Sequence, residues 1–249
     1  RKWRGGHDKE QWEKLKALPN LIYTDGNDFS LWRDGSPVGE IVKLVGDVQA
    51  SGAKLAAPDN LLPLINDFLS WQPLAPKSVA ELAPVSARLC RFLRDEVVEQ
   101  LGLGSQPLEQ LAEDWRALLF PNSDDEQFAD GYAQAVTFGL LMAKSMKLSL
   151  AGGIDQVASA LGRSNSLIGA ALRLLTEAPE QEVLGPSLKT LTRVLDVVSW
   201  DKITKGDPEA WLYFYEDFLE VYDNKLRKLT GSYYTPPEVV NAMVRLCDD

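Results

Sequence analysis

The sequence predicts a mainly α fold in which a helical bundle follows a small antiparallel β remnant of an α/β domain. Three observations carry this prediction. Short apolar runs separated by Asp-Gly dipeptides occupy the first 50 residues. From residue 58 onward, apolar residues recur at the 3.6-residue spacing of amphipathic helices. The 249 residues are 45% hydrophobic and 25% charged, a composition that can bury a sizeable core.

The first 50 residues contain a short amphipathic helix and three strands. The helix places Trp12, Leu15 and Leu18 on one face and stops at Pro19. The Asp-Gly dipeptides between the following runs are typical of hairpin turns, so the strands form an antiparallel meander. Because three strands and one helix make an incomplete sheet, we expect the end of an α/β domain over residues 1–50. The expected elements are a helix at 8–18 and strands at 21–24, 29–33 and 38–45.

The middle of the chain is expected to be a helical spacer over residues 58–230. Clusters of Pro, Gly, Ser and Asp, the longest at 179–187, separate its apolar runs. The runs show no fixed repeat period, which favours a bundle over a solenoid. The expected helices lie at 60–71, 78–102, 107–120, 124–148, 153–178, 184–200 and 207–229.

Charge and cysteine content exclude several classes of protein. The net charge is -10, which argues against a surface that attracts nucleic acid everywhere. Only residues 131–206 are net positive, with 8 basic and 6 acidic residues. Two distant cysteines and one histidine assemble neither a disulfide framework nor a zinc site. Without a signal peptide or an apolar run near the ~20 residues of a membrane span, we expect a cytoplasmic protein without a membrane partner.

The stretch LTGSYYTPPEVV, near residue 235, has the composition of a helix start. Thr235 fits the N-cap, Pro236 the first helical position, and Glu238 the third position of a capping box. Tyr233 and Tyr234 stand just before a helix N-terminus, where free N–H groups favour an anion. Two aromatic rings beside a helix N-terminus suit a ligand that has both an aromatic or cationic part and a carboxylate.

The segment from Tyr215 to Leu246, which contains this stretch, resembles the entry to the catalytic domain of gamma-class N6-adenine DNA methyltransferases. The similar enzymes are large single-chain restriction-modification and phage-defence proteins. The resemblance implies that residues 231–249 begin a methyltransferase domain. It also implies that S-adenosylmethionine is bound by Tyr233, Tyr234, Thr235 and Pro236.

A second segment, Leu15 to Gly39, resembles the end of the restriction-endonuclease-like domain at the front of the same proteins. The resemblance thus implies a site-specific adenine methyltransferase that acts on double-stranded DNA, with Mg²⁺ only if a nuclease domain is active. The family's glycine loop and its Asn/Asp-Pro-Pro-Tyr/Phe loop are absent from the sequence, and no nuclease Asp/Glu-x-Lys triplet lies on the predicted strands. We therefore expect a piece of a longer protein that by itself neither methylates nor cuts DNA. The sequence leaves the oligomeric state open.

A different function, non-enzymatic DNA binding or scaffolding, is suggested by residues 154–172, which fit a helix-turn-helix. Ala158 would face inward, Gly162 would lie in the turn and Ile168 on the second helix. The segment belongs to the net-positive part of the chain, although paired helices with a glycine turn are common in α domains. The polar residues that would start or follow on the recognition helix are Arg163, Ser164, Asn165, Ser166 and Arg173.

Aromatic residues are concentrated near the end of the predicted bundle. Core packing and stacking with nucleic-acid bases both account for such a concentration, and core packing is favoured. The residues are Trp200, Trp211, Tyr213, Phe214, Tyr215, Phe218 and Tyr222.

Overall fold

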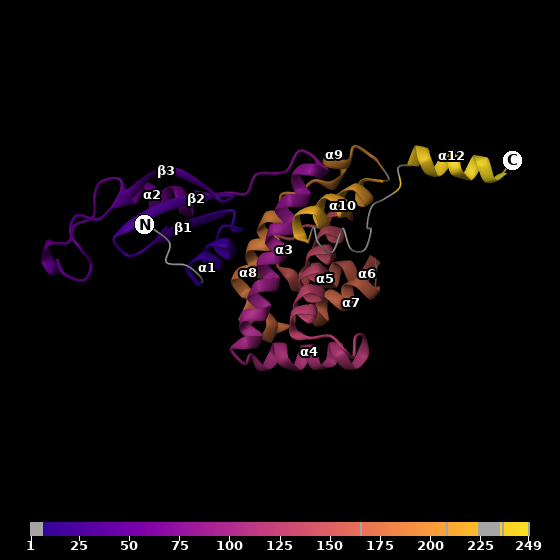
Figure 1. Cartoon of the computed structure of the whole chain (residues 1–249), viewed down its shortest axis with the longest axis horizontal. Coiled ribbons are helices and arrows are strands. Elements are labelled where there is room, and N and C mark those ends of the chain that lie inside the picture. Colours follow the sequence, from indigo (N-terminus) through magenta and orange to yellow (C-terminus); the bar gives the residue numbers. More distant parts are fainter. Residues whose placement is uncertain (1–6, 165, 208, 224–234, 236, 249) are drawn as a thin grey trace.

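The computed structural model describes residues 7–164, 166–207, 209–223, 235 and 237–248. The described chain is mainly α, with a helical bundle and a small three-stranded antiparallel sheet beside it (Figure 1). The predicted fold class is confirmed.

The sheet has the order β1-β2-β3 and is formed by β1 (Asn20–Thr24), β2 (Asp28–Arg33) and β3 (Ser36–Lys43). Neighbouring strands are antiparallel, as predicted. At the second hairpin, Asp34 and Gly35 have φ angles of 48° and 77°. Two consecutive residues with positive φ are what a tight turn between twisted strands requires, and Asp-Gly supplies them at low cost.

One helix predicted to belong to the spacer covers the sheet instead. α2 (Leu61–Leu69) buries Leu64 against Leu31 and Val42 of the strands. The predicted boundary at residue 58 is therefore wrong, because 3.6-residue periodicity shows that a helix has an apolar face but not which core buries it. The sheet, α1 (His7–Leu15) and α2 form one unit, and the bundle begins at α3.

The bundle is built around α3 (Val79–Gly102), against which α5, α8 and α10 pack (Figure 1). Ser78 caps α3 by accepting a hydrogen bond from the Glu81 N–H, a common way to start a helix. The single large core includes fully buried side chains from every long helix. The remaining bundle helices are α4 (Gln106–Leu118), α5 (Asp125–Ser145), α6 (Ile154–Ser164), α7 (Ser166–Leu175), α8 (Ala178–Asp196), α9 (Trp200–Thr204) and α10 (Ala210–Tyr222).

The predicted break at residues 179–187 is wrong, because α8 runs through it. Pro179 occupies the first turn of α8, where a missing N–H leaves no intrahelical hydrogen bond unmade. Pro186 lies inside the helix, so neither proline acts as a terminator here. The predicted helix at 207–229 is described only as α10, since residues 224–229 lie outside the described part of the chain.

The aromatic concentration near residues 200–222 is confirmed as core packing except at Tyr213, which is exposed. Phe214 and Phe218 are fully buried and Tyr222 is nearly so. The Phe218 ring lies 5.0 Å from that of Phe138 on α5, in an edge-to-face arrangement. Trp200 and Trp211 stack on each other with ring centroids 4.1 Å apart.

Candidate functional site

The segment predicted to bind the cofactor is described only in part. Tyr233, Tyr234 and Pro236 lie outside the described residues, and Thr235 is exposed. The helix predicted after Thr235 is present as α12 (Pro237–Asp248). The cofactor site therefore stays a prediction.

The chain leaves the bundle at Tyr222, the last residue of α10, and this point is held by side chains of two other helices. The Tyr222 hydroxyl donates a hydrogen bond to the Asp130 carboxylate of α5. The Arg91 guanidinium of α3 donates to the carbonyl groups of Val221 and Tyr222. Arg94 lies 5.7 Å from the centre of the Tyr222 ring. The end of α10 is thus fixed to both α3 and α5, only a few residues before the predicted cofactor segment.

Cys90 lies in the same region, and its surroundings argue against a reactive thiol. The side chain is fully buried in α3. Burial raises the pKa of the Cys90 thiol to about 12. At neutral pH it is protonated and packs as a small apolar side chain.

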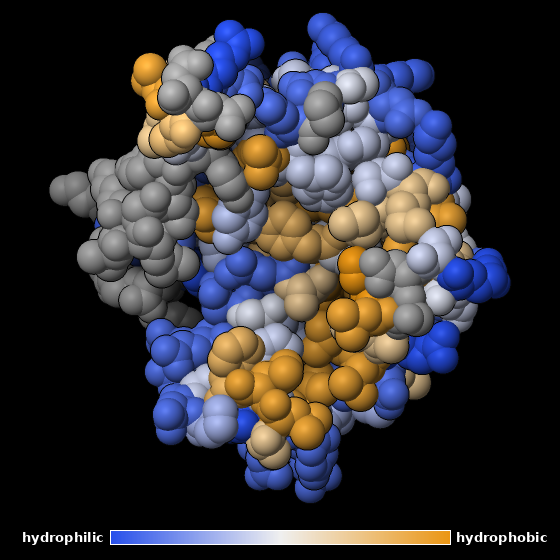
Figure 2. Space-filling view, turned by 90° about the vertical axis from the view of Figure 1, so that its right-hand side faces the viewer, coloured by the Kyte–Doolittle hydropathy of each residue, from blue (hydrophilic) through white to orange (hydrophobic). Residues whose placement is uncertain are grey.

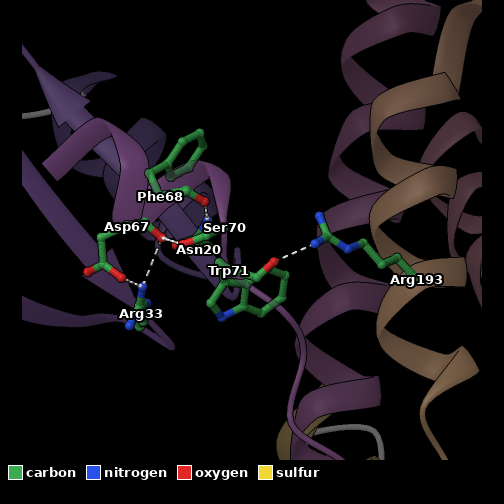
Figure 3. Close-up of polar contacts among 7 residues, drawn as sticks. All are labelled: Asn20, Arg33, Asp67, Phe68, Ser70, Trp71 and Arg193. Carbon is green, nitrogen blue, oxygen red and sulfur yellow. Dashed lines mark hydrogen bonds and ion pairs between the residues drawn. The ribbon is translucent and has the colours of Figure 1, made fainter. Parts of the chain in front are cut away.

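Polar contacts also hold the sheet unit on the bundle (Figure 3). Within the sheet unit, the Arg33 guanidinium donates to the Asp67 carboxylate at 2.7 Å, and the Asn20 amide donates to the Phe68 carbonyl at 2.9 Å. From the bundle, Arg193 of α8 donates to the Trp71 carbonyl, and its guanidinium lies 5.2 Å from the centre of the Trp71 ring. Trp71 directly follows α2, so Arg193 holds the end of the sheet unit on the bundle.

A second anchor of the sheet unit lies on α1. The Lys14 ammonium group is 3.5 Å from the Glu96 carboxylate of α3 and also pairs with Glu99. It lies 5.7 Å from the centre of the Phe92 ring as well. The sheet unit is thereby held at two places, α1 and Trp71, which restricts its rotation on the bundle.

An open cleft of about 640 Å³ lies at this junction. Four of its five charged residues are paired with each other, Arg33 with Asp67 at 2.7 Å and Arg88 with Asp34 at 3.8 Å. The fifth, Glu81, accepts a hydrogen bond from the Lys77 N–H at 2.8 Å. Because each of these charged groups already has a partner, the cleft presents no evident side chain that could act as an acid, a base or a nucleophile. Within the described ranges, no group of three or more His, Cys, Asp or Glu side chains could hold a metal ion.

The predicted helix-turn-helix residues form two packed helices, α6 and α7. Ala158 is fully buried and Ile168 lies on α7, as predicted. Gly162 is not in the turn, because α6 continues to Ser164. Arg163 and Ser164 therefore end the first helix rather than begin the second, and Asn165 lies outside the described residues. Gly162 and Gly169 face each other where the two helices approach closely.

The exposed face of α7 lacks the row of polar side chains expected of a helix that reads DNA bases. Leu167 is 80% exposed and Leu174 is 53% exposed. Arg173 is exposed and is the only charged residue on α7. Since direct reading of base edges uses polar side chains, this face supplies few of them. The spacing of Leu167 and Leu174 was visible in the sequence, but periodicity did not show that they face outward.

Comparisons of the chain with protein-family models, curated proteins and solved structures give no match. None of the described helices combines the length and apolar character needed to cross a membrane. The family resemblance of the two end segments therefore stays a prediction.

Glu180, in the first turn of α8, is a buried carboxyl group with one oxygen that has no hydrogen-bond partner. Burial raises the pKa of Glu180, and the charge of Glu177 adds to the effect. The folded state thus holds the Glu180 proton more tightly than the unfolded state. The stabilisation that this bound proton provides is therefore completely present below the ordinary carboxyl pKa. That contribution is lost as the pH rises through the raised pKa of the folded state.

Glu180→Gln is therefore expected to increase the free energy of unfolding at neutral pH and to have little effect near pH 4, roughly the ordinary carboxyl pKa. Urea unfolding followed by circular dichroism at several pH values measures this difference. Glu182→Gln, at an exposed position of the same helix, is the control and should show no such pH dependence. A constant difference between Glu180→Gln and the parent at all pH values would contradict the prediction.

Proposed function

We propose that this chain is the connecting segment of a site-specific adenine-N6 DNA methyltransferase of a restriction-modification or defence system. In this proposal the sheet unit is the end of a nuclease-like domain, and the residues from 231 onward begin the methyltransferase domain. The complete enzyme uses S-adenosylmethionine, acts on double-stranded DNA and works in the cytoplasm. The chain by itself is inactive.

One observation supports the proposal most: the helical bundle holds the sheet unit on one side and, on the other, fixes the end of its own helix α10, from which the chain continues towards residue 231. The sheet unit is fixed to α3 by Lys14 and to α8 by Arg193. The end of α10 is fixed to α3 and α5 through Tyr222. A spacer fastened in this way sets the distance and orientation between the parts that it joins.

The proposed role of the C-terminal segment is to hold the cofactor. Thr235 caps the following helix and helps to present N–H groups to the carboxylate of S-adenosylmethionine, and Tyr234 provides a flat packing face. Methyl transfer itself belongs to the domain that follows, where a flipped adenine meets the cofactor.

In the enzyme with a complete methyltransferase domain, Tyr234→Ala is expected to weaken S-adenosylmethionine binding about two- to tenfold, since an aromatic contact contributes about 0.5–1.5 kcal/mol. Thr235→Ala is expected to weaken binding and also to lower stability by about 1 kcal/mol, because the helix loses its cap. Calorimetric titration of the cofactor and thermal melting curves of both variants measure the two effects separately.

The matched control is Tyr213→Ala, which removes a tyrosine that is 45% exposed on α10 and does not belong to residues 229–240. It should leave cofactor affinity unchanged. If Tyr234→Ala and Thr235→Ala bind the cofactor as tightly as the parent does, residues 229–240 form only a well-capped helix and the assignment of the site is wrong.

The alternative is a non-enzymatic DNA-binding or scaffolding module that uses residues 154–172. The packed pair α6 and α7 is compatible with it. The apolar exposed face of α7 favours scaffolding over direct DNA reading.

A further inference from the structure

The outer face of α7 carries an exposed apolar stripe that no described element covers. Leu167, Ala170, Ala171 and Leu174 are all exposed and follow the i, i+3, i+4, i+7 spacing of one helix face. The opposite face buries Leu172 and Leu175 in the bundle core. A helix that is apolar on both faces is expected to be covered on both.

The apolar surface continues beyond α7. Leu118, Leu119 and Phe120, at the end of α4, are between 56% and 77% exposed. The end of α4 and the end of α7 are fixed to the same part of α5: Trp115 packs on Phe128, and the Tyr132 hydroxyl donates to the Leu175 carbonyl at 2.7 Å.

Figure 2 faces the side on which α6, α7 and the end of α4 lie in Figure 1, and hydrophobic surface gathers over its lower half. Stable interfaces bury about 800 Å² per partner, more than one short helix face supplies. The stripe and the end of α4 together offer a larger apolar area than the stripe alone.

Charged side chains of both signs border the stripe. Arg163 precedes the start of α7 and Glu177 follows its end, and both line an open groove of about 640 Å³ beside Ala170 and Leu174. Neither forms an ion pair with a described residue. Arg173 lines the same groove beside Leu174, so the border of the stripe has Arg163 near the N-terminal end of α7 and both Arg173 and Glu177 near its C-terminal end.

We propose that this surface binds the same surface of a second copy of the chain, with the two α7 helices antiparallel about a two-fold axis. The stripe is self-complementary in that arrangement: Leu167 of one copy meets Leu174 of the other, and the small side chains of Ala170 and Ala171 meet at the centre. The arrangement also brings Arg163 of each copy to the end where the other copy carries Glu177, so two pairs of opposite charges form, while Arg173 stays at the border of the groove. Isologous interfaces of this kind are the commonest in homo-oligomers.

The same features disfavour a DNA duplex at this surface. Its centre is apolar, and a phosphate backbone would meet Glu177 as well as the arginines. The antiparallel pairing satisfies both signs of charge and covers the leucines.

Sedimentation velocity over a range of about 1 to 300 µM is expected to show a reversible dimer with a dissociation constant in the micromolar range. Leu174→Glu is expected to weaken the dimer at least about tenfold, because a charge is then buried against Leu167 of the other copy. Leu103→Glu is the control, since Leu103 is 73% exposed at the end of α3, outside the surface. A chain that stays monomeric throughout, or a dimer that Leu174→Glu leaves intact, overturns the proposal.

Charge reversal tests the antiparallel arrangement. Arg163→Glu alone and Glu177→Arg alone each place like charges together twice in a homodimer, and each is expected to weaken the dimer about tenfold. An equimolar mixture of the two variants restores opposite charges at both ends, so heterodimers should form about as well as the parent dimer. If the mixture associates no better than either variant alone, the proposed arrangement is wrong. A monomer that binds a mixed-sequence duplex through Arg163 would likewise overturn it.

Discussion

Replacing Phe218 by alanine is expected to lower the free energy of unfolding by about 3–5 kcal/mol, the usual cost of removing a buried aromatic ring. Phe218 is fully buried where α10 meets the bundle core. Its ring centre lies 5.1 Å from that of Tyr222 and 5.0 Å from that of Phe138. A cavity there removes contacts on both sides, since a packed core relaxes only in part. Urea unfolding followed by circular dichroism measures the loss.

The control for this prediction is Tyr213→Ala, on the same helix. Tyr213 is 45% exposed, so its loss removes comparable ring area without leaving a cavity in the core. Its effect is expected to stay below about 1 kcal/mol. Equal losses for the two variants would show that the helix propensity of α10, and not the packing of Phe218, determines the result.

The elements of the fold were largely predictable from the sequence, because each depends on local chemistry. Asp34-Gly35 specifies a hairpin through two residues that adopt positive φ. The long apolar periodicities over 78–102 and 124–148 match α3 and α5 closely. In these segments local propensity and tertiary packing favour the same structure.

The wrong predictions concern short sequence patterns that are compatible with two different tertiary arrangements. α2 has an ordinary amphipathic pattern, and only the folded structure shows that Leu64 joins the sheet rather than the bundle. Pro179 can end one helix or begin another, and here it begins α8. Leu167 and Leu174 fit a buried stripe equally well, yet they face outward.

The candidate site was less predictable than the fold, because its contacts join residues far apart in the chain. Tyr222 bonds to Asp130 across 92 positions of sequence, and Arg193 bonds to Trp71 across 122. Neither pair has a spacing or motif that a single sequence reveals. Motif reasoning instead found Tyr234 and Thr235, whose signal is contained within a few consecutive residues.

The contact between α6 and α7 depends on two glycines that face each other. A Cβ atom built on Gly169 would lie 2.3 Å from both the Cα and the N of Gly162, and 2.9 Å from the Ala158 carbonyl oxygen. These are backbone atoms of a neighbouring helix and cannot move aside as a flexible side chain can. A Cβ atom built on Gly162 meets only the Gly169 Cα, at 3.9 Å, which is an ordinary van der Waals distance. The two glycines therefore tolerate substitution very differently, although they share one contact.

Gly169→Ala is expected to lower the free energy of unfolding by about 3 kcal/mol, the upper end of the usual cost of overpacking, because α6 and α7 must separate to admit the methyl group. Gly162→Ala is the matched control and should be neutral or stabilise the protein by up to about 1 kcal/mol, since alanine favours a helix over glycine. Urea unfolding of both variants measures the difference. Because separation of the helices also displaces Leu167 and Leu174, Gly169→Ala should weaken self-association in sedimentation velocity, whereas Gly162→Ala should not. If alanine at the two positions has the same effect on stability, the close approach of α6 and α7 is not what Gly169 provides.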